Sequence, residues 1–143
     1  MTIRGARFSQ SGFTMIELLL VMVILGMLAA LVGPNLIRQG AKARAKTARV
    51  QIANLGTALD TFALDVGRYP TNQEGLQALI ERPSGLKMWD GPYLPKAVPP
   101  DPWGNEYQYS EPSGDDELYR LVSLGADGRA GGDSDAADIS NLD

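Results

Sequence analysis

The sequence predicts an α+β protein in which one long N-terminal helix packs on a small antiparallel β-sheet. The helix is predicted by two neighbouring patterns: residues 18–33 are all apolar or glycine, and a helical stripe of apolar residues follows over 41–66. The sheet is predicted by two short runs, EYQYS at 106–110 and LYRLVS at 118–123, with the turn-forming residues PSGD at 112–115 between them. Because two short strands are too small to be stable alone, we expect them to pack on the helix.

The composition excludes several kinds of functional site. The chain of 143 residues has no cysteine and no histidine, so it cannot form a disulfide, a Cys/His zinc site or a Ser-His-Asp triad. Any bound metal must therefore be held by oxygen atoms, which favours calcium or magnesium. No segment matches the P-loop pattern either, so the chain has no sign of an ATPase site.

The net charge of −4 is unevenly distributed along the chain. Residues 1–50 contain seven Lys or Arg and a single acid, Glu17, whereas residues 51–143 contain six Lys or Arg and sixteen Asp or Glu. Because nucleic-acid binding needs a basic face, the acidic second part argues against a nucleic-acid partner.

The first 37 residues have the pattern of a short polar leader followed by a membrane segment. Residues 1–12 are polar and contain no acid, and an apolar segment covers 13–37. A bilayer core is crossed by about 20 residues of helix, so this segment is long enough to span. An ordinary secretory signal would need a small-residue cleavage site, and LAA at 28–30 is a poor one. A cut at the polar-to-apolar junction, between Gly12 and Phe13, would instead keep the apolar segment in the mature protein.

Two residues do not suit a simple membrane anchor. Glu17 places a carboxylate near the start of the apolar run, where charges are costly and usually functional, although the first turn of a helix also favours an acid. Pro34 lacks an N–H group and should kink or locally melt the helix over 30–34. The basic residues that follow the segment, counted by the positive-inside rule alone, would place the C-terminal side in the cytoplasm, so composition leaves the orientation open.

Residues 38–66 are expected to continue the same helix with one apolar face. The apolar positions alternate in steps of four and three over about seven turns. Gly67 is a predicted C-cap, and Pro70 prevents continuation. The small residues of the stripe suit packing against sister helices, with a simple tethering stalk as the alternative. The stripe consists of Ala41, Ala45, Ala48, Ile52, Leu55, Leu59, Phe62 and Val66.

Residues 67–143 are predicted to form the globular part. Thr71 and Glu74 form a capping-box pattern that opens a short helix ending before Pro83. Six prolines within 83–104 predict an ordered loop, which aromatic side chains should hold in place: Trp89, Tyr93 and Trp103.

The last twenty residues, within a predicted loop at 123–143, are rich in Asp and Gly. Carboxylates and carbonyls on a flexible loop are typical calcium ligands, and glycines let the backbone turn so that carbonyls converge. The spacing does not fit an EF-hand, however. Composition alone therefore favours a solvated acidic tail over a calcium site.

Six segments of this chain together resemble a known family. GFTMIE at 12–17, followed by an apolar run and Pro34, resembles the N-terminal signal of type IV pilins and pseudopilins. The other segments resemble the major pseudopilin of the type II secretion system: GRYPTNQEGLQALIERP (67–83), GPYLPK (91–96), DPWGNEYQY (101–109), and SLGADGRAGG (123–132) with ADI (137–139). The resemblance covers nearly the whole chain and implies a pilin-like fold.

This resemblance implies roles for the N-terminal residues. Gly12 would precede the bond cut by the prepilin peptidase, and Phe13 would become the methylated N-terminus. Glu17 would neutralise the amino group of Phe13 on a neighbouring subunit during assembly, since pairing offsets much of the cost of burying each charge. Pro34 would mark where the helix melts in the filament.

The resemblance also implies calcium binding by the C-terminal loop. The expected ligands are three side chains and two backbone carbonyls, with Asp133 as a weaker candidate. They are the side chains of Asp127, Asp135 and Asp138 and the carbonyls of Leu124 and Arg129.

The expected function is the major structural subunit of the type II secretion pseudopilus, a periplasmic filament that helps to push folded proteins across the outer membrane. The expected partners are copies of the chain, minor pseudopilins, the prepilin peptidase, the inner-membrane assembly platform and membrane lipid. The resemblance implies that the N-terminus lies in the cytoplasm and the globular part in the periplasm. This orientation is opposite to the one that the positive-inside rule alone would give.

Three alternatives are weaker. A type IV pilin or minor pseudopilin would share the membrane segment but not the proline loop and the ADI motif. A membrane-anchored periplasmic hydrolase could use Asp115 with Asp116 or Asp65 with Glu74, but the short globular part leaves little chain to build a pocket. A passive anchored binding module is the third, and crosslinking between copies would distinguish it from a filament subunit.

Overall fold

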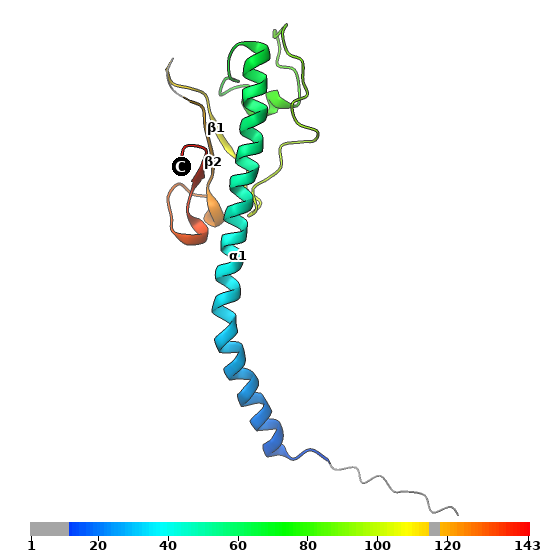
Figure 1. Ribbon diagram of the computed structural model, residues 1–143, viewed down its shortest axis with the longest axis vertical. Helices are drawn as coiled ribbons and strands as arrows, with labels where there is room; N and C mark the ends of the chain where they lie inside the picture. Colours follow the sequence, from blue (N-terminus) through cyan, green and yellow to red (C-terminus); the bar gives the residue numbers. More distant parts are fainter. Residues whose placement is uncertain (1–11, 115–117) are drawn as a thin grey trace, which may run out of the picture. The chain divides into compact units, whose positions relative to one another are not determined.

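The computed structural model describes residues 12–114 and 118–143, with the backbone alone at 32–37. The chain divides into two compact units, one that ends at Arg38 and one formed by Gln39–Asp143. The elements follow in the order α1, η1, β1, β2, η2, η3 and β3, where η denotes a 3₁₀-helix (Figure 1).

Helix α1 covers Met15–Val66 without interruption. At its start the Thr14 hydroxyl oxygen accepts a hydrogen bond from the Glu17 N–H at 3.3 Å, which satisfies one of the free donors of the first turn. At its end Gly67 has a φ of 84°, a left-handed conformation that favours glycine, and its N–H donates to the Ala63 carbonyl at 2.8 Å. The helix therefore begins two residues after the predicted start at residue 13 and ends at the predicted residue 66. Gly67 is the C-cap, as predicted.

The backbone around Pro34 corrects one expectation. Residues 30–34 are helical, so the local melting predicted there is absent from the single chain. Proline removes one hydrogen bond, but the turns on either side keep theirs, and a long helix tolerates such a local loss. Melting of this segment in an assembled filament remains a prediction.

A membrane segment was expected at 13–37, which covers the N-terminal part of α1. Within the described part of the chain, no helix combines the length and the apolar character that crossing a bilayer requires. The predicted span therefore stays a prediction.

The C-terminal unit contains one antiparallel sheet in the order β1-β2-β3. Its strands are short: β1 is Gln108–Ser110, β2 is Arg120–Ser123 and β3 is Ile139–Ser140. The β1–β2 hairpin was predicted, although each strand is shorter than its sequence run. Strand β3 was not predicted, because two residues within a Gly- and Asp-rich segment carry no periodic pattern; its pairing with β2 defines it.

The core lies between the second half of α1, the sheet and the proline-rich loop, which Figure 1 shows beside that half of the helix. Helix α1 contributes its predicted stripe, in which Leu59 and Phe62 are fully buried. The remaining core residues are one further alanine of α1, apolar side chains of β2 and β3, tyrosines and two residues of η1: Ala58, Leu121, Ile139, Tyr107, Tyr119, Ala78 and Leu79.

The capping box opens a shorter element than expected. The Thr71 N–H donates to Glu74 Oε2 at 2.8 Å, and the Glu74 N–H donates back to the Thr71 hydroxyl at 3.3 Å. The helix that follows is the 3₁₀-helix η1, Gly75–Leu79, rather than an α-helix. Gly75 has a φ of 55°, outside the right-handed helical region, so a regular α-helix cannot run through it.

The aromatic residues hold the proline-rich loop as predicted. The Trp89 indole N–H donates to the Ala78 carbonyl at 2.8 Å, and the Tyr93 ring packs edge-on against Phe62 with centroids 5.6 Å apart. Trp103 packs against the core and donates from its indole N–H to Asp135. The loop is therefore fixed to the helix and to the C-terminal segment.

Candidate functional site

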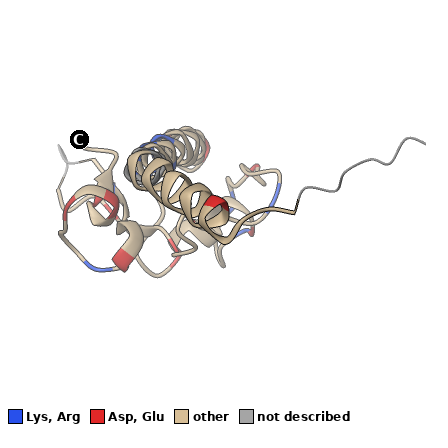
Figure 2. Ribbon diagram, turned by 90° about the horizontal axis from the view of Figure 1, so that it is seen from below, with Lys and Arg blue, Asp and Glu red and all other residues tan. Residues whose placement is uncertain are grey.

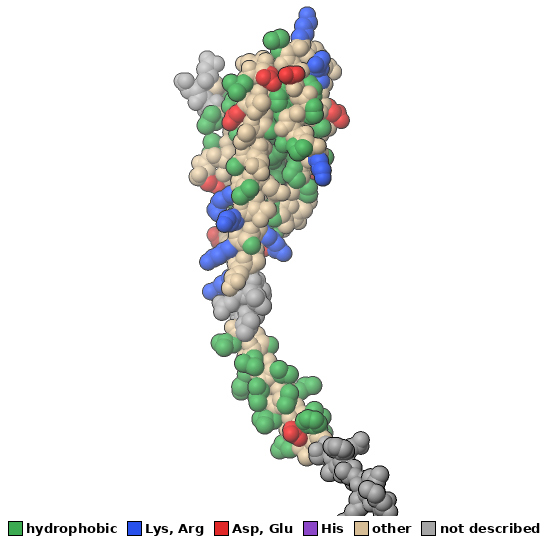
Figure 3. Space-filling view, turned by 45° about the vertical axis from the view of Figure 1, so that its right-hand side comes forward, with side chains coloured by type: hydrophobic (Ala, Val, Ile, Leu, Met, Phe, Trp, Pro, Cys, Tyr) green, Lys and Arg blue, Asp and Glu red, His purple; other side chains and the backbone are tan. Residues whose placement is uncertain are grey.

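The N-terminal part of α1 exposes its apolar side chains, and Figure 3 shows them gathered along the face in view. Leu31 is 74% exposed and Met15 is 82% exposed, and the apolar residues between them are exposed as well. A contiguous apolar surface of this size normally binds lipid or another protein. We therefore regard this segment as a binding surface and not as part of the protein's own core.

The residues expected to act in processing and assembly lie at the start of this surface. Gly12 and Phe13 precede α1 and are exposed, and the rest of the predicted leader, residues 1–11, lies outside the described residues. Glu17 is exposed in the first turn of α1, where the helix dipole favours a carboxylate. Pro34 belongs to the helical backbone, but its side chain lies outside the described part.

The second candidate site is the C-terminal loop between β2 and β3, where Figure 2 shows several acidic residues close to the C-terminus. Two 3₁₀-helices shape this loop: η2, Gly125–Asp127, and η3, Ser134–Ala136. A Cβ atom at Gly125 would lie 2.9 Å from the Ala137 carbonyl oxygen, and one at Gly132 would overlap the Ala136 carbonyl oxygen. The glycines therefore let the η2 and η3 backbones approach each other closely.

The five expected calcium ligands are not equivalent in this loop. Asp127 is exposed, and its Oδ1 accepts the Arg129 N–H at 3.1 Å. Asp138 Oδ2 accepts the Gly131 N–H at 2.9 Å, while its Oδ1 is buried without a hydrogen-bond partner among the described residues. Leu124 is half-buried at the start of the loop.

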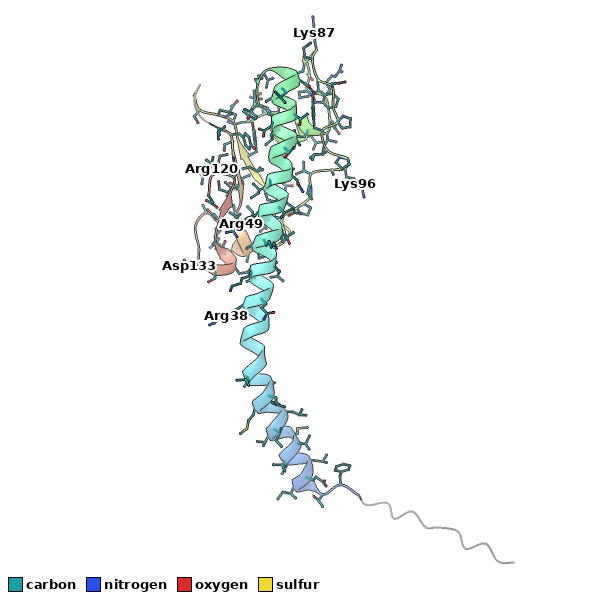
Figure 4. The ribbon with its side chains drawn as sticks, in the orientation of Figure 1. Arg38, Arg49, Lys87, Lys96, Arg120 and Asp133 are labelled. Atoms are coloured by element: carbon teal, nitrogen blue, oxygen red, sulfur yellow. The ribbon has the colours of Figure 1, made fainter. Side chains whose placement is uncertain are left out.

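Asp135 differs from the other two carboxylates. Its Oδ1 accepts the indole N–H of Trp103 at 3.0 Å, and its Oδ2 lies 3.4 Å from Arg44 Nη1 of α1. Within residues 12–114 and 118–143, no three Asp or Glu side chains come together as a metal-binding group. Asp127, Asp135 and Asp138 therefore do not form one acidic cluster. The weaker candidate Asp133 is exposed on the same loop, where Figure 4 labels it.

The loop nevertheless has features that suit a calcium ion. The buried Oδ1 of Asp138 lacks a donor, and burying an unpaired carboxylate oxygen is costly. Two carboxylates combined with backbone carbonyls are sufficient chemistry for calcium, which takes six to eight oxygen ligands and accepts water among them. Carboxylates beside backbone carbonyls are therefore donors of the kind that calcium takes, and the unpaired oxygen of Asp138 is the observation in this loop that favours a cation.

A turn at residues 101–105 supports this loop and was not identified as functional from the sequence. Asp101 is 3% exposed, and its Oδ1 accepts the backbone N–H groups of Trp103 and Asn105 at 3.0 and 2.8 Å. The Asn105 side chain then donates to the Gly125 carbonyl at 2.8 Å. The run Asp-Pro-Trp-Gly is a turn signal, because Asp accepts from the backbone two residues on and Pro fixes φ. It predicts the turn but not its contacts with η2 and η3.

Two family models together match nearly the whole chain. Residues 35–142 match the family model "Type II secretion system (T2SS), protein G", and residues 7–33 match the "Prokaryotic N-terminal methylation motif". The chain is 46% identical to type II secretion system core protein G of Pseudomonas aeruginosa over 96% of this chain and 98% of that protein. It is 44% identical to the Vibrio cholerae protein of the same name, over 92% of this chain and 91% of that protein.

A solved structure agrees with these relatives. The crystal structure of the major pseudopilin from the type 2 secretion system of enterohaemorrhagic Escherichia coli matches with a TM-score of 0.60 and 33% identity. The match covers 76% of this chain and 94% of that one. A family model over most of the chain and relatives of high coverage lead to one conclusion: the chain belongs to the protein G family of type II secretion pseudopilins.

Proposed function

We propose that this chain is the major structural subunit of a type II secretion pseudopilus and acts by polymerising, not by catalysis. The observation that carries this proposal is the division of α1. Its second half buries one face in the globular core, from Ala48 to Phe62, whereas the residues from Met15 to Leu31 expose an apolar surface. Such a surface needs lipid before assembly and neighbouring helices after it.

The N-methylation motif supports a processing step at the start of this surface. We propose that the prepilin peptidase cuts between Gly12 and Phe13, which leaves Phe13 as the methylated N-terminus. Glu17 lies in the first helical turn, four residues after Phe13. During assembly its carboxylate would pair with the amino group of Phe13 on a neighbouring copy, because an isolated charge among apolar helices is costly.

The proposed location follows from the same segment. The apolar part of α1 would anchor the chain once in the inner membrane, with its N-terminus in the cytoplasm and residues 67–143 in the periplasm. The minor pseudopilins and the inner-membrane assembly platform would then be its partners. Assembly would draw subunits out of the membrane into a periplasmic filament that helps to move folded proteins across the outer membrane.

We also propose that the C-terminal loop binds calcium. Asp127 and Asp138 would provide carboxylate oxygens, and Leu124 and Arg129 backbone carbonyls; Asp135 is the third expected side chain, and both of its oxygens already have donors. Bound calcium would neutralise the unpaired Asp138 oxygen and stabilise the folded loop by mass action.

The first experiment compares the mature protein and its assembly in one set of strains. The intact mass and N-terminal sequence of protein from membranes should show methylated Phe13.

Glu17→Ala should be cut normally but form few or no filaments, as measured by crosslinking between copies. Glu81→Ala, which removes an exposed acid far along the sequence, is the matched control and should assemble normally. Normal filaments from Glu17→Ala would contradict the charge-pairing step, and a mature start near residue 31 would contradict the filament proposal.

A further inference from the structure

Three basic side chains lie on one exposed face of α1, which we call the basic face: Lys42, Lys46 and Arg49. At about 100° of rotation per residue, their directions fall within about 60° of one another around the helix axis. Arg44 lies on the opposite side of the helix, about 160° away, where its Nη1 is 3.4 Å from Asp135. Figure 3 shows basic side chains crowded on this part of the chain, and Figure 4 labels Arg49 on α1.

The basic face has no ion pair within the part of the chain that the structure describes. The ion pairs found there are those of Arg44 with Asp135 and of Arg68 with Glu74. Along the helix itself, residues 18–59 contain no Asp or Glu, so no acid three or four positions away can pair with these bases. Because the three like charges also repel one another, an anionic surface that meets the basic face would be bound favourably.

The basic face follows the predicted membrane segment closely along the sequence. Lys42 comes five residues after the end of that segment at residue 37, and Arg49 comes twelve residues after it. Stretches of helix of these lengths rise about 7 and 18 Å. The headgroup layer extends about 6 Å beyond the hydrocarbon core, long basic side chains reach back towards it, and charges act over about 8 Å at physiological ionic strength. An anionic bilayer surface is therefore within reach of all three bases.

The orientation proposed above gives this face an unusual location. It places the three bases on the periplasmic side, whereas Lys and Arg next to a membrane segment normally stay in the cytoplasm. Bases that oppose this rule make insertion in the proposed orientation less favourable. A binding role at the membrane surface gives a physical reason for keeping them there.

We infer that the basic face binds anionic phospholipid headgroups and holds the globular unit of an unassembled subunit at the surface of the inner membrane. The inference rests on the proposed function, because it needs the membrane segment and the orientation given there. Lipid is favoured over an acidic neighbouring copy because lipid would already surround the preceding part of the same helix. Each base near an anionic surface strengthens binding about fivefold, so entry into a filament would have to break a substantial contact.

The test measures which lipids surround the full chain in phosphatidylcholine vesicles. Spin-labelled phosphatidylglycerol and spin-labelled phosphatidylcholine are added in turn, and the motionally restricted fraction of each label gives the preference for the anionic lipid. The wild type should prefer phosphatidylglycerol about fivefold or more. The triple variant Lys42→Gln, Lys46→Gln and Arg49→Gln should lower this preference at least about threefold. Salt at about 1 M should lower the wild-type preference as well, because charges then act over about 3 Å only.

A matched control removes the same amount of charge elsewhere in the globular unit. Lys87→Gln, Lys96→Gln and Arg120→Gln together change three exposed bases outside α1, all labelled in Figure 4, and should keep the wild-type preference. Both triple variants should unfold at the wild-type temperature, since all six bases are exposed. A lower lipid preference could then not be caused by misfolding.

The outcomes distinguish this inference from its alternatives and from the proposed function. An equal lipid preference in the wild type and the basic-face variant would overturn the inference. An equal loss in the control would overturn it as well, because net charge alone would then attract the lipid. A basic-face variant that keeps the lipid preference but forms fewer crosslinks between copies would assign the face to an acidic neighbouring copy instead. Wild-type protein that prefers the anionic lipid but forms no filaments would support the inference and contradict the proposed function.

Discussion

The Ser123 hydroxyl donates a hydrogen bond of 2.6 Å to Asp101 Oδ2, and both side chains are buried. This contact joins the last residue of β2 to the turn that supports the C-terminal loop. Because Asp101 also accepts two backbone N–H groups, a single buried carboxylate organises the turn, the strand end and, through Asn105, helix η2.

Removal of this carboxylate should be among the most destabilising single changes in the globular unit. Asp101→Ala would leave the Ser123 hydroxyl and the Trp103 and Asn105 N–H groups without their acceptor, which costs about 3 kcal/mol or more in the free energy of unfolding. Urea unfolding measures this loss. Glu106→Ala, at an exposed acid on the approach to β1, should change the free energy of unfolding by less than about 0.5 kcal/mol. A loss as small for Asp101→Ala would contradict the organising role of Asp101.

The ion pair between Arg68 and Glu74 should make stability depend on acid pH. Arg68 binds the Glu74 carboxylate with two nitrogens at 2.7 and 2.8 Å, and these bonds, with the Thr71 N–H, lower the pKa of Glu74 to about 2. A carboxylate with a lowered pKa stabilises the fold above its unfolded pKa of 4.5, and this contribution is lost as the pH falls towards 2.

Glu74→Gln should therefore be less stable than the wild type at neutral pH. Because Arg68 is 42% exposed and solvent screens the pair, the expected difference is about 1 to 2 kcal/mol. The difference should shrink between pH 4.5 and 2, as Glu74 becomes protonated in the wild type. Urea unfolding at several pH values provides the measurement, and a difference that stays constant over that range would show that the charge of Glu74 is not its cause.

Two neighbouring glycines of the C-terminal loop provide a matched pair for substitution. Gly131 and Gly132 have φ values of 96° and 97°, so alanine is strained at both. Gly131 faces open space, whereas a Cβ at Gly132 would overlap the Ala136 carbonyl oxygen. Gly131→Ala should cost about 1 to 2 kcal/mol from the backbone alone, and Gly132→Ala should cost clearly more because the backbone of η3 must move. Equal losses in thermal stability would show that the loop rearranges freely around residue 132.

Calcium removal should reveal which acids bind the metal. Asp138→Asn and Asp127→Ala should melt nearly like the wild type in chelator but lose the rise in Tm that calcium causes. Calcium at 100 times its Kd would add about 2.7 kcal/mol, so the lost rise should be several degrees. Asp143→Asn changes an acid three residues beyond the end of β3; it is the control and should keep the full calcium response. A full response from Asp138→Asn would remove Asp138 from the proposed site.

Local patterns predicted most of the helical structure. The stripe became the core-facing side of α1 from Ala45 to Val66, and Gly67 ends the helix in the conformation that its missing side chain allows. The capping box formed as predicted, because it depends only on residues three apart. Because these features depend only on residues that are close together in the sequence, they can be predicted from the sequence alone.

The contacts around the C-terminal loop could not be predicted in the same way. Strand β3 exists through its pairing with β2, and the Trp103–Asp135 contact joins residues 32 positions apart. The loop composition suggested acidic ligands but not that Asp135 would bind an indole and an arginine instead of joining Asp127 and Asp138. The assembly roles proposed for Phe13 and Glu17 would depend on neighbouring copies, so the sequence of one chain predicts them only through resemblance.

The short strands of the sheet have a consequence for the crowded conditions in which a filament subunit exists. The edges of a β-sheet attract the edges of other sheets, and this is a common route to aggregation at high protein concentration. Here β1 has three residues and β3 has two, so neither edge offers more than a few backbone groups for a second chain. Neighbouring copies at high concentration would therefore have little tendency to associate through the edges of their sheets. Helix α1 is then the surface left for ordered contacts between copies.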